Sequence, residues 1–130
     1  MLVGIAITFL AFVIFTSNVL ALSENPPVQP LVLLDCGVIA VKPAKSGSYV
    51  VANGSITCAS SHPSLKVVTG IKDVTGNRYT SVVKTCYNIA QCSVSAKLSY
   101  YSNRYWYTDV SGYQGTDWNA YTYSNTVLIP

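Results

Sequence analysis

The stretch "KTCYNIAQCSVSAK", from Lys84 to Lys97, places two of the chain's four cysteines close together, with five residues between them. Such a pair could bind a metal, act as a redox couple or form a structural disulfide. Zinc sites usually combine two close cysteine pairs, or one pair with histidines. Here Cys36 and Cys58 are far apart, and His62 is the only histidine. Redox motifs have two intervening residues, not five. The spacing therefore favours a structural disulfide and predicts no metal site.

The amino-terminal segment predicts the compartment in which these cysteines act. Residues 1–23 begin with a long apolar run and end in small and polar residues, which is typical of a secretory signal peptide. The alternative is a membrane anchor, but the run is at the short end for a bilayer span and no positively charged stop follows it. We expect a secreted protein without a membrane span after cleavage, with an extended leader over residues 24–30 and one domain over residues 31–130.

Secretion implies that the four cysteines pair with one another. Three pairings are possible. Cys86–Cys92 is favoured because a short loop costs least to close, and this choice leaves Cys36–Cys58. We therefore expect two structural disulfides.

The residues after Cys92 have the alternation of a β-strand, with Val94, Ala96, Leu98 and Tyr100 on one face. Further strands are expected at 31–41 (a pair interrupted at 35–37), 49–59, 65–71, 104–110 and 118–129. Turns or loops are expected at 42–48, 60–64, 72–80 and 111–115, with a turn or bulge at 53–54. Residues 79–88 fit either a strand or a short helix. The pattern predicts a mostly β protein, a small antiparallel sandwich or barrel.

Several classes of function are disfavoured by what the sequence lacks. The net charge is +3 and no basic run is present, which argues against nucleic-acid binding. There is no glycine-rich phosphate loop and no Gly-x-Ser-x-Gly or His-Glu-x-x-His motif. His62 precedes Pro63 in a polar segment, where a solvated surface role is favoured over catalysis. We expect neither an enzyme nor a cofactor.

The carboxy-terminal third is rich in aromatic residues. Nine of them fall between Tyr100 and Tyr123, interleaved with Asp, Asn and Gln. Sugars bind through ring stacking and hydrogen bonds to hydroxyls, and this composition supplies both. Adjacent strand residues point to opposite faces, so about half of these side chains are expected in the core, and an exposed aromatic cluster marks a contact surface. The candidate ligand-binding residues are Tyr105, Asp109, Asp117 and Trp118.

Asn53-Gly54-Ser55 forms an N-glycosylation sequon. The alternative interpretation is a simple turn. A glycosylated Asn53 has to be exposed, so the sequon predicts an exposed side chain at this position.

The stretch "SVVKTCYNIAQCSVSA" at 81–96 resembles a segment of SUEL-type galactose- and rhamnose-binding lectin domains, in which the two cysteines form a local disulfide. "GSITCASSHPSLKVVTGI" at 54–71 is similar to the family's Leu-Ser-Cys and following strand. "TDVSGYQGTDWNAYTYS" at 108–124 is similar to its closing segment. The resemblance covers Ile56 to Ser124 and implies extracellular monosaccharide binding.

The chain departs from that family at several positions. The family's Tyr-Gly-Arg falls on 72–74, which do not match, and its glutamate before the first cysteine strand has no counterpart. Its lysine near Asp117 is absent. Its terminal cysteine, which in the family pairs with the cysteine matching Cys58, is also absent, so the resemblance implies that Cys58 needs Cys36 as its partner instead. Of the family's Asp-Pro-Cys only Asp109 remains, and this is the one site residue that the resemblance transfers.

These observations together predict a secreted, non-catalytic, lectin-like module that recognises an extracellular glycan. The alternative is a small secreted effector, defence protein or toxin whose tyrosine-rich face binds a cell-surface or secreted protein. A third possibility is a structural extracellular protein that self-associates through the aromatic face.

Overall fold

The computed structural model describes residues 35–130, apart from the side chains of Trp118 and Asn119. The predicted signal peptide and leader lie outside these residues. The described chain forms seven strands: β1 Cys36–Ala40, β2 Ala44–Ser46, β3 Tyr49–Asp73, β4 Arg78–Ser99, β5 Arg104–Gln114, β6 Asp117–Tyr123 and β7 Val127–Ile129. They make one antiparallel sheet, so the mostly β prediction is confirmed. No helix forms between residues 35 and 130, and the segment at 79–88 is part of β4.

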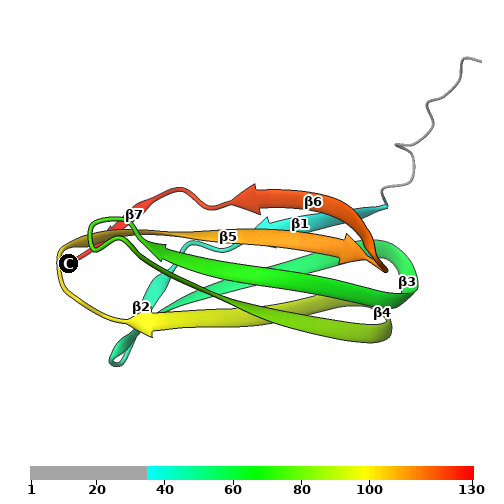
Figure 1. The fold of residues 1–130 in the computed structure, drawn as a ribbon, viewed down its shortest axis with the longest axis horizontal. Coiled ribbons are helices and arrows are strands. Elements are labelled where there is room, and N and C mark those ends of the chain that lie inside the picture. Colours follow the sequence, from blue (N-terminus) through cyan, green and yellow to red (C-terminus); the bar gives the residue numbers. More distant parts are fainter. Residues whose placement is uncertain (1–34) are drawn as a thin grey trace, which may run out of the picture. The chain divides into compact units, whose positions relative to one another are not determined.

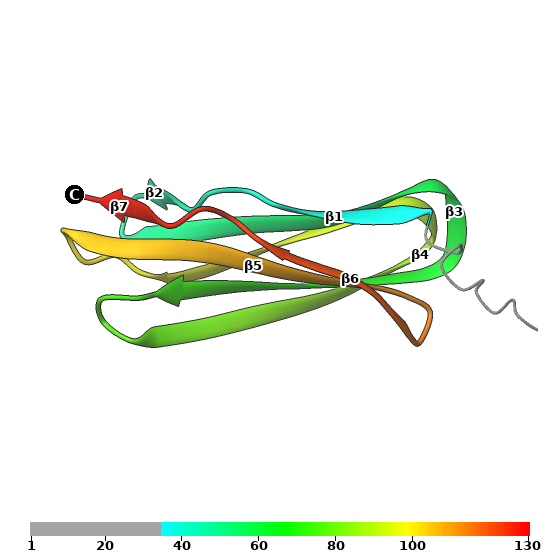
Figure 2. The ribbon, with the colours of Figure 1, turned by 90° about the horizontal axis from the view of Figure 1, so that it is seen from above.

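The fold is built on a long ribbon made by β3 and β4, which is folded double (Figure 1). The ribbon closes at a turn after Asp73, which pairs with Arg78. The pairing shifts between Thr57 and His62, where residues 58–61 of β3 lie opposite Ala90 alone. Because β3 has more residues than β4 in this part, β3 runs along the outside of a bend. The ribbon reverses direction at this bend (Figure 2).

The bend divides the sheet into two facing layers. The first layer contains β1, β2, residues 49–57 of β3 and residues 91–99 of β4. The second contains the other halves of β3 and β4 together with β5, to which β6 and β7 are added. Side chains that alternate inward from both layers fill the space between them, as in a sandwich.

Close approach of the layers explains why Asn53-Gly54 is not a turn. A Cβ at Gly54 would clash with the side chains of Thr69 and Val110 in the opposite layer. Glycine is therefore needed inside a continuous strand because another element packs against its backbone. The expected turn or bulge at 53–54 is wrong. The expected loop at 60–64 is also wrong, because it forms the bend within β3.

Both predicted disulfides are present and lie close to the bend. Cys36–Cys58 joins β1 to β3, and Cys86–Cys92 spans the bent part of β4. Cys58 and Cys92 are buried in one core cluster with Ile56, Leu65, Val67 and Val110. The disulfides therefore fix the end at which the ribbon folds over.

The opposite end of the second layer is held by a buried carboxylate. Asp73 has no exposed side-chain surface and accepts hydrogen bonds from Arg78 and Arg104 at 2.7–2.9 Å. Its other oxygen accepts from the Gly76 amide at 2.8 Å. Burial alone would raise the pKa of Asp73, but the hydrogen bonds from Gly76, Arg104 and Arg78 together hold it below its usual range. This network joins the β3–β4 turn to the start of β5.

Three further features of the described residues complete the fold. Val94, Ala96, Leu98 and Tyr100 share the less exposed side of their segment, as their alternation predicted. The turn expected at 111–115 begins later, because β5 continues to Gln114 and Gly115 has a φ of 66°. Among residues 35–130, no helix is long and apolar enough to cross a membrane.

Candidate ligand-binding face

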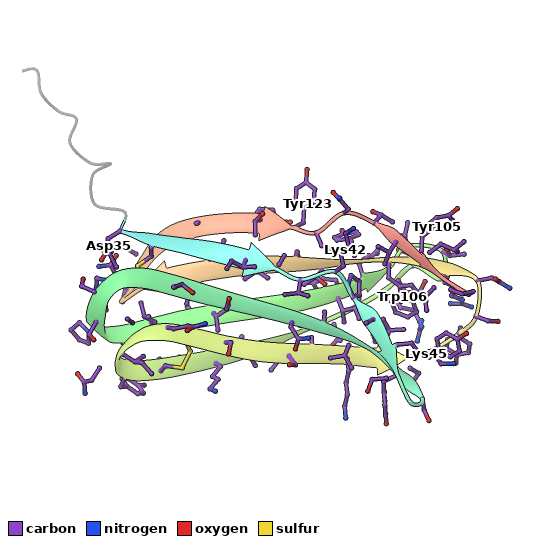
Figure 3. All side chains as sticks on the ribbon, turned by 180° about the vertical axis from the view of Figure 1, so that it is seen from behind. Asp35, Lys42, Lys45, Tyr105, Trp106 and Tyr123 are labelled. Carbon is purple, nitrogen blue, oxygen red and sulfur yellow. A yellow bond between two sulfur atoms is a disulfide. The ribbon has the colours of Figure 1, made fainter. Side chains whose placement is uncertain are left out.

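The outward side of the second layer carries several exposed tyrosines from β4, β5 and β6. Trp106, Thr108 and Val110 of β5 are buried between the layers, so Tyr107 and Asp109 point the other way. Figure 3 shows Trp106 turned inward while Tyr105 and Tyr123 point away from the ribbon. Four outward tyrosines, which we call the tyrosine face, lie around Asp109. They are Tyr79, Tyr107, Tyr121 and Tyr123.

Three of these tyrosines form the walls of a small pocket. Tyr107, Tyr121, Tyr123 and Thr126 line a hollow of about 200 Å³. The Tyr107 and Tyr123 rings meet edge to face with centroids 6.5 Å apart, and Tyr121 lies 6.2 Å from Tyr123 at a tilt. Tyr121 and Tyr123 are 51% and 67% exposed. The hollow is smaller than the roughly 300–1,000 Å³ that drug-sized ligands occupy, so it has room for only a small group.

Asp109 lies beside this hollow and is bound from the other side by Tyr79. The Tyr79 hydroxyl donates to Asp109 Oδ1 at 3.2 Å. Tyr79 reaches it across Gly70, which pairs with Asp109 in the sheet. A Cβ at Gly70 would clash with the Tyr79 hydroxyl and with Asp109 Oδ1. Glycine at this position therefore makes room for the contact.

The surroundings of Asp109 disfavour its charged form. Burial raises the pKa of Asp109, and the hydrogen bond from Tyr79 only partly offsets this effect. Burial and the nearby Asp109 charge also raise the pKa of Tyr79 and of Tyr121. Both phenols are therefore protonated at neutral pH and can donate hydrogen bonds.

Asp109 has no basic partner among the described residues. The ion pairs of residues 35–130 involve Asp35 and Asp73 instead. Two lysines of β3 share the outward side, but Lys72 donates to Asn77 at 2.8 Å and Lys66 lies over the Tyr113 ring at 4.2 Å. The carboxylate thus sits partly buried among phenol rings without a counter-ion from this part of the chain.

The structure separates the four residues predicted to bind ligand. Asp109 lies within the tyrosine face. Tyr105 shares the outward side of β5 but pairs with Leu128 at the end of the strand, away from the hollow. Asp117 is exposed at the β5–β6 turn, opposite Gln114. Trp118 pairs with Tyr113 through its backbone, and its side chain is outside the described part.

Asp109 is the only residue of the site that was predicted as a ligand contact. Tyr107, Tyr121 and Tyr123, which line the hollow with Thr126, were noted only as members of the aromatic cluster, and Tyr79 and Gly70 were not predicted at all. Tyr79 lies far from the aromatic carboxy-terminal third and reaches the site only because β4 pairs with β3. Gly70 stands inside a strand pattern, and such a glycine is a signal for close approach of another group. That signal was available in the sequence.

Asn53 is exposed, as the sequon requires. Its Oδ1 accepts a hydrogen bond from Ser95 on the neighbouring strand. Its glycosylation remains a prediction.

A second polar cluster surrounds His62 at the bend. Its side chain is only 13% exposed, less than the expected solvated role implies. Nε2 lies 3.1 Å from both Asp35 oxygens, and Nδ1 lies 2.7 Å from Gln114 Nε2. Ser60 donates to Asp35 at 2.9 Å, which is the largest cause of the lowered pKa of Asp35. Both ring nitrogens are engaged, so this cluster joins the start of β1 to the bend.

Comparison with known protein families and with curated proteins finds no match to this chain.

Proposed function

We propose that the protein is a glycan-binding module and that the tyrosine face is its binding surface. The observation that carries this proposal is the pocket of phenol rings beside Asp109, two of which, Tyr121 and Tyr123, are exposed. Exposed aromatic clusters usually mark contact surfaces, and sugar rings stack on aromatic faces through their C–H groups. The carboxylate and the protonated phenols supply hydrogen-bond acceptors and donors for hydroxyl groups.

The predicted lectin resemblance supports the same proposal through one residue. Asp109 is the only site position that the SUEL-type pattern transfers to this chain, and it lies next to the hollow. The remaining ligand contacts would come from Tyr79, Tyr107, Tyr121 and Tyr123, which the pattern does not provide. We therefore propose a pocket with its own specificity.

A glycan-array screen tests this proposal, using protein secreted by an oxidising expression host and confirmed by mass to contain both disulfides. We expect selective binding that free sugar competes away. Tyr121→Ala should abolish it, whereas Tyr87→Ala should not, because Tyr87 is equally aromatic, 69% exposed and lies on β4 outside the tyrosine face. A blank array from folded protein contradicts the proposal.

A glycine pair gives a finer control. Gly70→Ala places a methyl group against Tyr79 and Asp109, while Gly37→Ala meets nothing within 4 Å. We expect the first substitution to weaken binding and the second to leave it unchanged. Equal binding by both variants would show that the contact between Tyr79 and Asp109 does not contribute to sugar binding.

Protein binding is a second candidate, and it is favoured by a different surface. Among the described strands β4, Arg78–Ser99, pairs only with β3, so its other edge has no strand partner. Val83, Tyr87 and Ile89 are exposed on this strand. Free edges of this kind accept an added strand from a partner. Charged substitutions at Val83 would abolish this activity without affecting sugar binding.

A further inference from the structure

We propose that the glycan bound by the tyrosine face carries a positively charged amino group, so that the preferred ligand is a hexosamine with a free ammonium. This inference rests on the proposed function and names its ligand class. Its basis is an uncompensated carboxylate that lies next to a small hollow walled by phenol rings.

The carboxylate gives the first argument. Asp109 makes one hydrogen bond within the described chain, from Tyr79 to Oδ1, and Oδ2 has no partner there. A partly buried charge is costly unless it is paired and hydrogen-bonded. A ligand ammonium would supply both the opposite charge and up to three donors, whereas a neutral hydroxyl would supply only a hydrogen bond.

The rings give the second argument. Tyr107, Tyr121 and Tyr123 line the hollow beside Asp109. The faces of aromatic rings attract cations through their quadrupole, and the attraction increases when the cation is desolvated. The same rings can stack against the C–H face of a sugar. An amino sugar therefore uses both properties of the pocket, while a neutral sugar uses only one.

The overall charge of the protein restricts the source of any preference for a cationic ligand to a local carboxylate. The net charge is +3, so long-range electrostatics oppose the approach of a cationic ligand. A preference for the amine has to come from a local site, and Asp109 is the described carboxylate that lies among the tyrosines. Asp73 is fully buried under two arginines, and Asp35 is paired with His62.

The test compares three ligands of the same length by isothermal titration calorimetry with disulfide-intact protein. They are a glucosamine tetramer, its fully N-acetylated form and a glucose tetramer. Hydrogen bonds to charged groups are stronger than neutral ones, and the difference corresponds to about five- to thirtyfold in affinity, so we expect the free amine to bind about five- to thirtyfold more tightly. The preference should decrease as salt is raised.

Asp109→Asn should remove the preference and leave weak binding of all three ligands. A preference that survives in this variant would overturn the inference. If the variant fails to fold, the comparison of the three ligands on the wild-type protein still tests the inference. Equal binding of the amine and its acetylated form overturns the inference and leaves the proposed function standing. Binding of none of the three, with a blank array, overturns both. Equal binding of a lysine tetrapeptide would show that the ammonium acts without the sugar and would overturn the inference.

Discussion

Replacing Asp73 with asparagine should lower the free energy of unfolding by about 3 kcal/mol, at the lower end of the range for breaking a buried ion pair. Asp73 is fully buried and accepts three hydrogen bonds from Arg78 and Arg104. The two arginine side chains are 30% and 28% exposed and stack on Tyr101 at 4.6 Å. The two arginines therefore keep part of their hydration after the substitution. For this reason we expect a loss of stability at the lower end of the range for a buried ion pair.

Urea unfolding measures this effect. With a slope of about 2 kcal/mol per molar, the midpoint should fall by about 1.5 M at unchanged slope. Asp117→Asn is the matched control, because Asp117 is exposed at a turn and surface substitutions usually change stability by less than about 0.5 kcal/mol. A loss below about 1 kcal/mol for Asp73→Asn would mean that the network behaves like a surface ion pair, and would contradict the stabilising role given to the buried carboxylate.

Three further predictions concern pH, the disulfides and the site. Folding lowers the pKa of Asp73, so the stabilisation that its carboxylate gives is complete above its unfolded pKa of about 3.9 and is lost as the pH falls through the folded value. In acid, the urea midpoint of Asp73→Asn should therefore depend less steeply on pH than that of the wild type. Replacing Cys36 and Cys58 by alanine should cost about 3.4 kcal/mol and replacing Cys86 and Cys92 about 2.2 kcal/mol by loop-closure entropy, for separations of 22 and 6 residues; the reverse order in thermal or urea unfolding would contradict this account. Because the pKa of Asp109 is raised, its ionisation opposes folding as the pH rises above its unfolded pKa; at pH 7 Asp109→Asn should be at least as stable as wild type, and a clear loss of stability would show a structural rather than a binding role.

Much of the fold was predictable because strand alternation and cysteine spacing are local signals. The alternation from Val94 to Tyr100 identified a strand and its inward side. The short separation of Cys86 and Cys92 identified one disulfide and, by elimination, the other. These inferences needed no knowledge of how distant segments meet.

The course of β3 could not be predicted in the same way. Asn53-Gly54 and the segment 60–64 have the composition of turns, yet they belong to one strand of 25 residues. Gly54 is required because the opposite layer approaches its backbone, and Pro63 lies beside the bend, where pairing with β4 is irregular. The need for glycine at position 54 and the bend beside Pro63 both come from tertiary packing, which overrides local turn propensity.

The site was predictable only in part for the same reason. The aromatic third and Asp109 were visible as a composition signal on two neighbouring strands. Tyr79 joins them through the register between β3 and β4, which sequence alone does not fix. Tyr105 and Asp117 were proposed from chemistry alone. The structure places Tyr105 near the start of β5 and Asp117 at the β5–β6 turn, both away from the hollow. Position along a strand decides which residues share a pocket.

The most direct test of the account is to locate a bound sugar on the protein by NMR. A partly N-acetylated glucosamine tetramer would be titrated into ¹⁵N-labelled, disulfide-intact protein while backbone amide shifts are followed. We predict that the largest shifts occur at Gly70, Asp109 and Tyr121, with little change along β1 or the outer edge of β4. Shifts concentrated on β4 or the first layer, or no shifts at millimolar sugar, would contradict the claim that the tyrosine face binds a glycan.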